Sequence, residues 1–194
     1  MTDITDPIEL FGKWYDEATK LDAHEPTSVV LATATKDAVP SARVMLLKGF
    51  DERGFRVFTN LTGRKGRELL ENPKAALCFY WDKMDRQVRV EGDVERVEGH
   101  EADEYFASRS RESRIGAWAS KQSNVMENPD DLMSRVNEIT EQFAGEQIPR
   151  PPFWDGFRIK PNVIEFWEKR DFRLHKRTVF RKSQTGWDFE ILYP

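Results

Sequence analysis

The sequence holds a single cysteine, three histidines and no long apolar run. Cys78 alone cannot form a disulfide within the chain, which favours a reducing, cytoplasmic setting. No hydrophobic stretch approaches the ~20 residues that a membrane-spanning helix needs. Residues 1–7 are polar and acidic, unlike a secretory signal. We therefore expect a cytoplasmic protein without a membrane segment.

The motifs of several common enzyme classes are also missing. Neither G-x-G-x-x-G nor G-x-x-x-x-G-K-[ST] occurs, so the usual nucleotide-binding loops are absent. The G-x-S-x-G elbow of serine hydrolases is absent too. One cysteine and the scattered His24, His100 and His175 do not make a zinc site, and we predict no metal. The net charge of −4 argues against a dedicated nucleic-acid-binding protein.

The length of 194 residues fits one domain with a real core, and we predict a single domain over 1–194. Apolar spacing after Asp6 and Pro7 predicts an N-terminal amphipathic helix over about 7–22. Helical patterns over 98–118, and again from Asn128 with Pro129 in its first turn, predict a helical insertion over about 98–145.

Short segments of alternating polarity predict most of the remaining structure as strands. These segments are 27–35, 42–48, 55–59, 75–81, 87–97, 156–159 continuing through 163–168, 173–181 and 187–192, with a short helix over 63–71. Many short strands without βαβ alternation predict an α+β fold, mainly antiparallel β, of barrel type with peripheral helices. The same pattern argues against a Rossmann fold.

The segment from Phe166 to Arg177 carries the strongest functional signal. In an extended strand, Arg173, His175 and Arg177 would share one face. Three such groups repel one another unless an anion lies among them. With Trp167 just upstream, this pattern suggests a pocket for a flat, anionic small molecule, although Trp167 and Trp154, taken alone, are of a type found more often as core or interface anchors than stacked on a cofactor.

Two further groups of basic residues are candidate ligand contacts. Arg64 and Lys65 stand at a helix start, where free N–H groups and the helix dipole suit a phosphate. The alternative is a solvated basic turn. Arg43 and Lys48 bracket an apolar strand, either as ligand contacts or as strand-end charges.

Tyr105, Arg109 and Ser113 are spaced four residues apart. On one continuous helix they would line a single stripe and could clamp a phosphate, or form a polar helix face. Gln87 and Gln122 could pair with the edge of a heteroaromatic ring, or simply be surface polar residues.

The order of these signals is more specific than any one of them. Together they resemble the pyridoxine (pyridoxamine) 5′-phosphate oxidases over nearly the whole chain, from about Pro7 to Pro194. The longest motifs of the resemblance are Ile115–Ser123 and Ile164–Arg177. The others are Arg43–Lys48, Phe58–Asn60, Gly63–Lys65, Arg86–Gly92 and Pro152–Arg158.

This resemblance implies an FMN-binding split β-barrel that works as a homodimer, with FMN at the subunit interface. It further implies a flavoprotein oxidoreductase of vitamin B6 metabolism and pyridoxine biosynthesis. The implied reaction oxidises pyridoxamine 5′-phosphate or pyridoxine 5′-phosphate to pyridoxal 5′-phosphate, with O2 as acceptor, and gives H2O2. No nucleic acid or membrane partner is implied.

The resemblance also assigns roles at matching positions. FMN would be bound by Arg43, Val44, Met45, Leu46, Leu47, Lys48, Phe58, Thr59, Arg64, Lys65, Gln87, Gln122, Ser123, Trp167 and Arg177. The substrate would be bound by Lys48, Tyr105, Arg109, Ser113, Arg173, Leu174 and His175, the first four at its phosphate. Arg173 and His175 would be the catalytic pair, over the pyridine ring and its reacting carbon.

The chain departs from the family pattern at two places. Lys176 stands where the pattern has aspartate, and Lys169 and Arg170 replace a position that often contains glycine. Strand alternation predicts that Lys176 faces away from the catalytic pair, so its neighbour changes and the site does not. Three alternatives remain: a non-catalytic flavin- or pyridoxal-phosphate-binding split-barrel protein, a flavoenzyme with another substrate, and a nucleic-acid-binding barrel.

Overall fold

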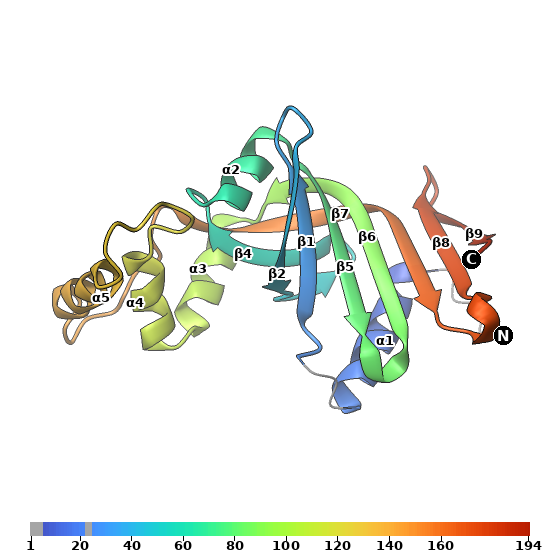
Figure 1. The fold of residues 1–194 in the computed structure, drawn as a ribbon, viewed down its shortest axis with the longest axis horizontal. Coiled ribbons are helices and arrows are strands. Elements are labelled where there is room, and N and C mark those ends of the chain that lie inside the picture. The colour runs from blue at the N-terminus through green and yellow to red at the C-terminus, as the bar shows by residue number, and fades with distance from the viewer. Residues whose placement is uncertain (1–5, 22–24) are drawn as a thin grey trace.

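The computed structural model describes residues 6–21 and 25–194. The predicted helix end at residue 22, and His24, lie outside the described residues. Within them the chain forms one nine-stranded sheet whose ladders are all antiparallel, together with five α-helices (Figure 1). The predicted α+β, mainly antiparallel class is confirmed.

The strands run in the order β2-β1-β5-β6-β7-β4-β3, and β8 and β9 extend from β7. Their bounds are β1 Ser28–Ala34, β2 Pro40–Leu46, β3 Phe50–Asp51, β4 Gly54–Asn60, β5 Lys74–Trp81, β6 Arg86–Arg96, β7 Trp154–Glu168, β8 Lys176–Lys182 and β9 Trp187–Leu192. The short helix α2, Arg64–Glu71, connects β4 to β5. Because most connections are short, strands that follow one another in sequence mostly pair with one another.

Strand β7 is the longest and organises the sheet. One edge pairs with β6, while the other is divided between β4 in its first part and β8 in its second. The two segments predicted at 156–159 and 163–168 are one continuous strand, which crosses Pro161 at an irregularity opposite Gly92. A Cβ at Gly92 would lie 2.0 Å from the Lys160 carbonyl oxygen, so only glycine fits there.

Helix α1, Pro7–Lys20, closes the apolar core. Asp6 caps it by accepting a hydrogen bond from the Ile8 amide at 2.7 Å, and Pro7 occupies the first turn. The helix buries Phe11, whose ring centroid lies 4.8–5.0 Å from those of Phe50, Phe55 and Phe79. The predicted N-terminal helix is thus confirmed within the described residues.

The helical insertion differs from the prediction. A single helix over 98–118 is wrong: α3, Gly99–Ser108, ends at Arg109, whose ψ of 152° is extended. Ser110 then caps α4, Arg111–Ala119, by accepting a hydrogen bond from the Ser113 amide at 3.2 Å. Helix α5, Asp131–Gln142, begins later than expected, because the Asn128 side chain bonds to the Asp130 amide instead of capping the helix.

The C-terminal strand also begins later than predicted. Strand β8 starts at Lys176, and the preceding residues form a short 3-10 turn in which Phe172 and Arg173 have φ of 55° and 63°. The His175 Nδ1 accepts a hydrogen bond from the Arg170 amide at 3.2 Å and helps to fix this turn. Arg173, His175 and Arg177 therefore do not share one face of a strand, and that prediction is wrong.

The core predicts a large effect for Phe11→Ala. Phe11 is fully buried, so its truncation should lower the free energy of unfolding by about 3–5 kcal/mol. Leu70→Ala is the control, because Leu70 is half exposed and should change stability by about 0.5 kcal/mol. Urea denaturation at one protein concentration measures both. A loss below about 1 kcal/mol for Phe11→Ala would contradict the packing described.

Candidate functional site

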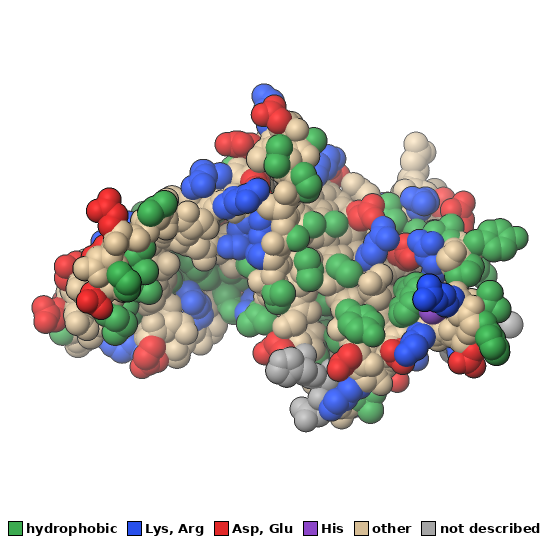
Figure 2. All heavy atoms as spheres, in the orientation of Figure 1, with side chains coloured by type: hydrophobic (Ala, Val, Ile, Leu, Met, Phe, Trp, Pro, Cys, Tyr) green, Lys and Arg blue, Asp and Glu red, His purple; other side chains and the backbone are tan. Residues whose placement is uncertain are grey.

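A cavity of about 450 Å³ opens between the sheet and the lobe formed by α3 and α4. Figure 2 shows basic side chains gathered in this region, below α2. The cavity brings together many of the predicted site residues. Those that line it are Met45, Leu46, Lys48, Phe58, Thr59, Lys65, Tyr105, Arg109, Ser113 and Gln122.

Arg109 is the most informative side chain in this cavity. Its Nη1 is buried and has no hydrogen-bond partner among the described residues. The guanidinium lies 5.0 Å from the Trp154 ring centroid, and Tyr105, Phe58 and Trp154 form an aromatic stack beside it. Burial lowers the pKa of Arg109 and raises that of Tyr105. A buried cation without a partner is costly, so this position suits an anionic ligand.

The break between α3 and α4 does not separate the predicted phosphate clamp. Tyr105 comes from α3, Arg109 from its end and Ser113 from the first turn of α4, and all three still line the cavity. Lys48 reaches the cavity from the loop after β2, which ends at Leu46, where the prediction had extended the strand to Lys48. The predicted helix and strand bounds were wrong, but the four residues of the predicted phosphate clamp still meet at one cavity.

Lys65, at the start of α2, borders the other side of the cavity. Its Nζ donates to the Gln122 Oε1 at 2.8 Å, and the Thr59 hydroxyl donates to the same oxygen at 3.2 Å. Burial lowers the pKa of Lys65, and the nearby charge of Arg43 lowers it further. An anion at this position would relieve both effects.

Arg43 and Arg64 converge on a buried carboxylate, that of Glu68. Arg64 Nε donates to Oε1 at 2.8 Å, and Arg43 Nη2 lies 3.4 Å from Oε2. Burial opposes the charged form, but hydrogen bonds from Ser41, Thr33 and Arg64 outweigh it and lower the pKa of Glu68 to about 2. Glu68 therefore holds these two cations close to Lys65, where like charges would otherwise repel.

Three other predicted cofactor contacts do not line the cavity. Val44 is exposed on β2, and Ser123 is exposed after α4 with φ of 66°. The Leu47 side chain is buried in the core, which leaves only its backbone available to a ligand.

The remaining predicted residues form a second group, here called the C-terminal cluster: Gln87, Trp167, Arg173, Leu174, His175 and Arg177. Gln87 pairs with Trp167 across β6 and β7, and Trp167 pairs with Arg177 across β7 and β8. The Trp167 and His175 ring centroids lie 4.6 Å apart. None of the six residues lines the cavity.

Lys176 and Lys169, which depart from the family pattern, both form ion pairs. Lys176 Nζ lies 3.3 Å from a Glu168 carboxylate oxygen, and Lys169 Nζ lies 2.9 Å from one of Asp85. Arg177 instead pairs with Glu165 at 2.8 Å, so Lys176 does have a different neighbour from Arg177. These contacts fix both ends of the turn that carries Arg173.

The cavity and the C-terminal cluster lie at opposite ends of β7. Trp154 lines the cavity and Trp167 belongs to the cluster, and at the usual rise the strand between them covers about 40 Å. Figure 1 shows α3–α5 and the β8–β9 hairpin on opposite sides of the sheet. One chain therefore does not bring all the predicted residues to one place.

Some residues of the cavity wall were not predicted as site residues. They are Asn60, Gly116, Ala117, Ser120 and Trp154. Gly116, Ala117 and Ser120 lie inside the motif Ile115–Ser123, so this motif could have identified them as site residues. Trp154 was considered as a core or interface anchor and not as a site residue. Glu68 was also missed, although it stands four residues after Arg64 on a helix.

The described residues contain no group of three or more His, Cys, Asp and Glu side chains placed to hold a metal ion. Among the helices described here, none is both long and apolar enough to cross a membrane.

Comparison with known proteins defines first the fold class and then the family. The structure of PhzG from Burkholderia lata, in complex with tetrahydrophenazine-1-carboxylic acid, superposes with a TM-score of 0.94 at 32% identity and covers 100% of this chain and 95% of that chain. A Nostoc punctiforme protein described as pyridoxamine 5′-phosphate oxidase-related and FMN binding has a TM-score of 0.77 at 16% identity, covering 97% of each chain. The fold is therefore the split barrel that was predicted.

Family models match almost the entire chain. Residues 16–167 match pyridoxamine 5′-phosphate oxidase, and residues 154–194 match the pyridoxine 5′-phosphate oxidase C-terminal dimerisation region. Proteins named pyridoxine/pyridoxamine 5′-phosphate oxidase from Rubrobacter xylanophilus and Rhizobium meliloti are each 52% identical, over 97% and 100% of this chain and 87% and 95% of their own lengths. The chain belongs to the pyridoxamine 5′-phosphate oxidase family, and the match to a dimerisation region supports the predicted homodimer.

Glu68 generates a prediction with a defined pH dependence. Glu68→Gln should lower the free energy of unfolding by about 3 kcal/mol at pH 7, because it breaks a buried ion pair. The pKa of Glu68 falls from 4.5 to about 2 on folding, so its contribution is complete above pH ~5 and is lost as the pH falls towards 2.

Urea denaturation of wild type and variant at pH 7 and pH 3 checks this prediction. The stability difference should shrink at pH 3. Glu71→Gln is the matched control, since Glu71 lies exposed on the same helix. A difference that is equal at both pH values would contradict the assigned role of the Glu68 charge.

Proposed function

We propose that this protein catalyses the FMN-dependent oxidation of pyridoxamine 5′-phosphate or pyridoxine 5′-phosphate to pyridoxal 5′-phosphate, with O2 as acceptor and H2O2 as second product. The observation that carries this proposal is the buried, unpartnered Nη1 of Arg109 in a cavity also lined by Lys48, Tyr105 and Ser113. Two cations and two hydroxyls around one space match the charge and acceptor geometry of a phosphate monoester.

The FMN phosphate would be bound on the α2 side of the cavity. Lys65 and Arg64 begin that helix, and its first amides add the positive end of a helix dipole. Arg43 approaches from β2 through its contact with Glu68. Three cations around one helix start fit a dianionic phosphate, so the residues present suit this cofactor.

The flavin ring would lie along the strand residues that line the cavity, where Gln122 offers an amide group for its polar edge, and Gln87 would approach it with the C-terminal cluster. Bound FMN supplies the redox chemistry, since it accepts two electrons from the substrate and passes them to O2. This chain then needs only to bind, orient and polarise the substrate.

Arg173 and His175 would act on the pyridine end of the substrate. The His175 Nδ1 accepts a hydrogen bond from the Arg170 amide, so the neutral ring carries its proton on Nε2. His175 thus presents an N–H donor while its ring is held against Trp167. Arg173, on the adjoining turn, would hold the substrate over the flavin and stabilise the charge that develops as electrons leave the substrate for the flavin.

We further propose that each active site combines the cavity of one subunit with the C-terminal cluster of its partner, and that FMN lies at this interface. The separation of the two groups along β7 supports this arrangement. Apolar side chains crowd the C-terminal end of the molecule, where Phe172, Ile191 and Tyr193 are 92%, 72% and 94% exposed in the single chain. A second copy would cover such a surface.

A direct assay tests the proposed reaction. The purified protein, loaded with FMN, should show flavin absorption in the visible range and convert pyridoxine 5′-phosphate to pyridoxal 5′-phosphate with one H2O2 formed per product. Anaerobic conditions should stop turnover. A protein that binds FMN but forms no product would instead be a non-catalytic split-barrel protein.

A mixed dimer tests the shared site. Arg109→Ala lies in the cavity and Arg173→Ala in the C-terminal cluster, and each homodimer should lose most of its kcat/KM. Co-expression with two affinity tags and purification through both gives the mixed dimer. If the two groups come from different subunits, one of its two sites is intact, and kcat/KM per dimer should return to about half of wild type.

If both groups served the same subunit, every site in the mixed dimer would carry one defect. Activity would then stay as low as in the homodimers, which would contradict the shared site without affecting the proposed reaction.

A further inference from the structure

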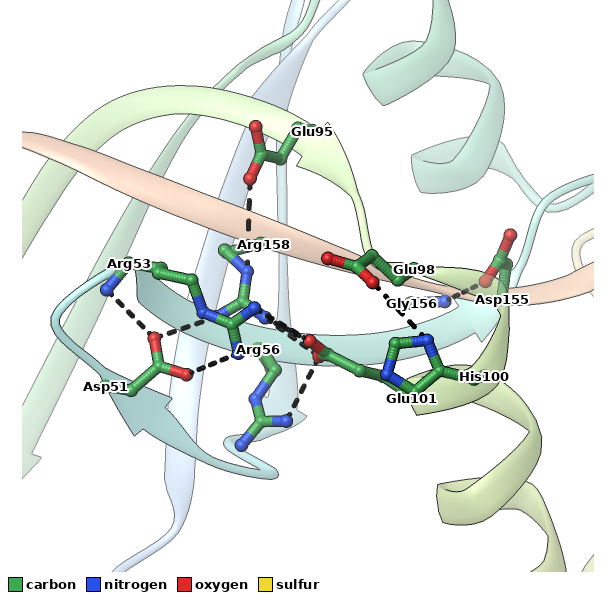
Figure 3. A network of polar contacts seen from close by, with 10 residues as sticks. All are labelled: Asp51, Arg53, Arg56, Glu95, Glu98, His100, Glu101, Asp155, Gly156 and Arg158. Carbon is green, nitrogen blue, oxygen red and sulfur yellow. Dashed lines mark hydrogen bonds and ion pairs between the residues drawn. The ribbon is translucent and has the colours of Figure 1, made fainter.

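A partly buried ion-pair network joins the start of α3 to the β3–β4 hairpin and to β7 (Figure 3). Its centre is Glu101, in the first turn of α3, whose side chain is 10% exposed. Arg158 donates to it at 2.8 and 3.0 Å, Arg53 Nη1 lies 3.0 Å away and Arg56 Nη1 lies 3.2 Å away. One carboxylate thus joins three arginines from β7, β4 and the β3–β4 turn.

Asp51 completes the network from the strand side. It lies 2.9 Å from Arg158 and 3.0 Å from Arg53, and Arg158 is shared among three carboxylates, since Glu95 also lies 4.0 Å from its Nε. The Arg158 side chain is only 3% exposed, and a charge so buried requires these partners. The network therefore fixes α3 to the sheet at one defined position.

Helix α3 carries one half of the proposed phosphate site. Tyr105 lies one turn after Glu101 on the same face, and Arg109 ends the helix. Helix α3 is also held by the stacking of Tyr105 on Phe58, by Phe106 against Trp154 and by the Asp103–Arg150 ion pair, but Glu101 is its contact with β4 and the β3–β4 turn. A shift of Glu101 would move Tyr105 and Arg109 with it.

Arg56 connects the same network to the other half of the site. Its backbone accepts a hydrogen bond from the Lys48 amide at 2.9 Å and donates to the Gly49 carbonyl at 2.8 Å. Its guanidinium packs on Gly49 so closely that a Cβ there would lie 2.6 Å from Nη2. The loop that presents Lys48 to the cavity is therefore held by the arginine that Glu101 binds.

We propose that Glu101 is a positioning residue that sets the spacing between Lys48 on one side of the cavity and Tyr105 and Arg109 on the other. This inference rests on the proposed function, because it assigns the cavity to a substrate phosphate. Glu101 touches no ligand. Its effect on phosphate affinity passes through Arg56 and through helix α3.

The test compares Glu101→Gln with wild type as FMN-loaded full-length protein. The amide keeps the size of the side chain but cannot balance three guanidinium groups. KM for pyridoxine 5′-phosphate should rise about tenfold, and the Ki of inorganic phosphate as a competitive inhibitor should rise in parallel. The kcat should stay within about twofold, because Arg173 and His175 lie outside the network.

The FMN dissociation constant, measured by fluorescence quenching, provides an independent readout. It should rise less than KM does, because Arg43, Arg64 and Lys65, which would hold the FMN phosphate, pair with Glu68 and Gln122, and among the predicted FMN contacts the network reaches Lys48 through Arg56. Glu98→Gln is the matched control: Glu98 lies just before α3, is exposed and contacts only His100 in the described structure. It should leave KM, Ki and kcat unchanged.

Loss of folded protein alone would reduce the apparent kcat without changing KM or Ki, so the two roles are distinguishable. If Glu101→Gln does not fold, Arg53→Gln tests the proposal instead. Arg53 is half exposed, and its replacement removes one of the three arginines that pair with Glu101. A KM rise of about twofold to threefold is expected for it. Unchanged KM and Ki in the variant that folds would overturn the proposal.

Calorimetric titration of inorganic phosphate into wild type and variant separates this proposal from the proposed function. If the wild type shows no turnover, the proposed reaction is wrong. The positioning role is still supported in that case if Glu101→Gln binds inorganic phosphate more weakly than the wild type does. With turnover in wild type and equal phosphate affinity in both proteins, only the positioning role fails.

Discussion

The structure depends on positive charges held close together around the cavity, and two buried carboxylates, one on α2 and one on α3, balance them. Glu68 on α2 binds Arg43 and Arg64, and Glu101 on α3 binds Arg53, Arg56 and Arg158. Without these carboxylates, like charges at these distances would repel one another. Arg109 is the exception, because its Nη1 has no partner among the described residues and is left for an anion.

The sequence predicted the fold class and most elements because their signals are local. Alternating apolar residues define β5 and β6, and Asp6 with Pro7 defines the start of α1. The errors lie where side chains compete with regular structure. Ser110 caps a new helix and splits 98–118 in two, and the His175 ring bonds to the Arg170 amide and delays β8. Neither hydrogen bond is visible in a periodicity pattern.

The candidate site was predicted mainly through the family motifs and less through geometry. The four-residue spacing of Tyr105, Arg109 and Ser113 pointed to one stripe of a helix that does not exist, yet the three side chains line one cavity. Glu68 and Glu101 were not predicted, because each acts through partners distant in sequence: Thr33 for Glu68, Arg53 and Arg158 for Glu101. Such long-range pairings appear only when the sheet is assembled.

Strand β7 sets the distance and the side-chain register between the cavity and the C-terminal cluster. It begins at Trp154 in the cavity wall and ends beside Trp167 in the C-terminal cluster, with neighbours along both edges. Inserting or deleting one residue between these tryptophans would turn every later side chain to the opposite face. The length of this strand and the position of its irregularity opposite Gly92 therefore couple the cavity wall to the C-terminal cluster, since a change in either would alter the register between them.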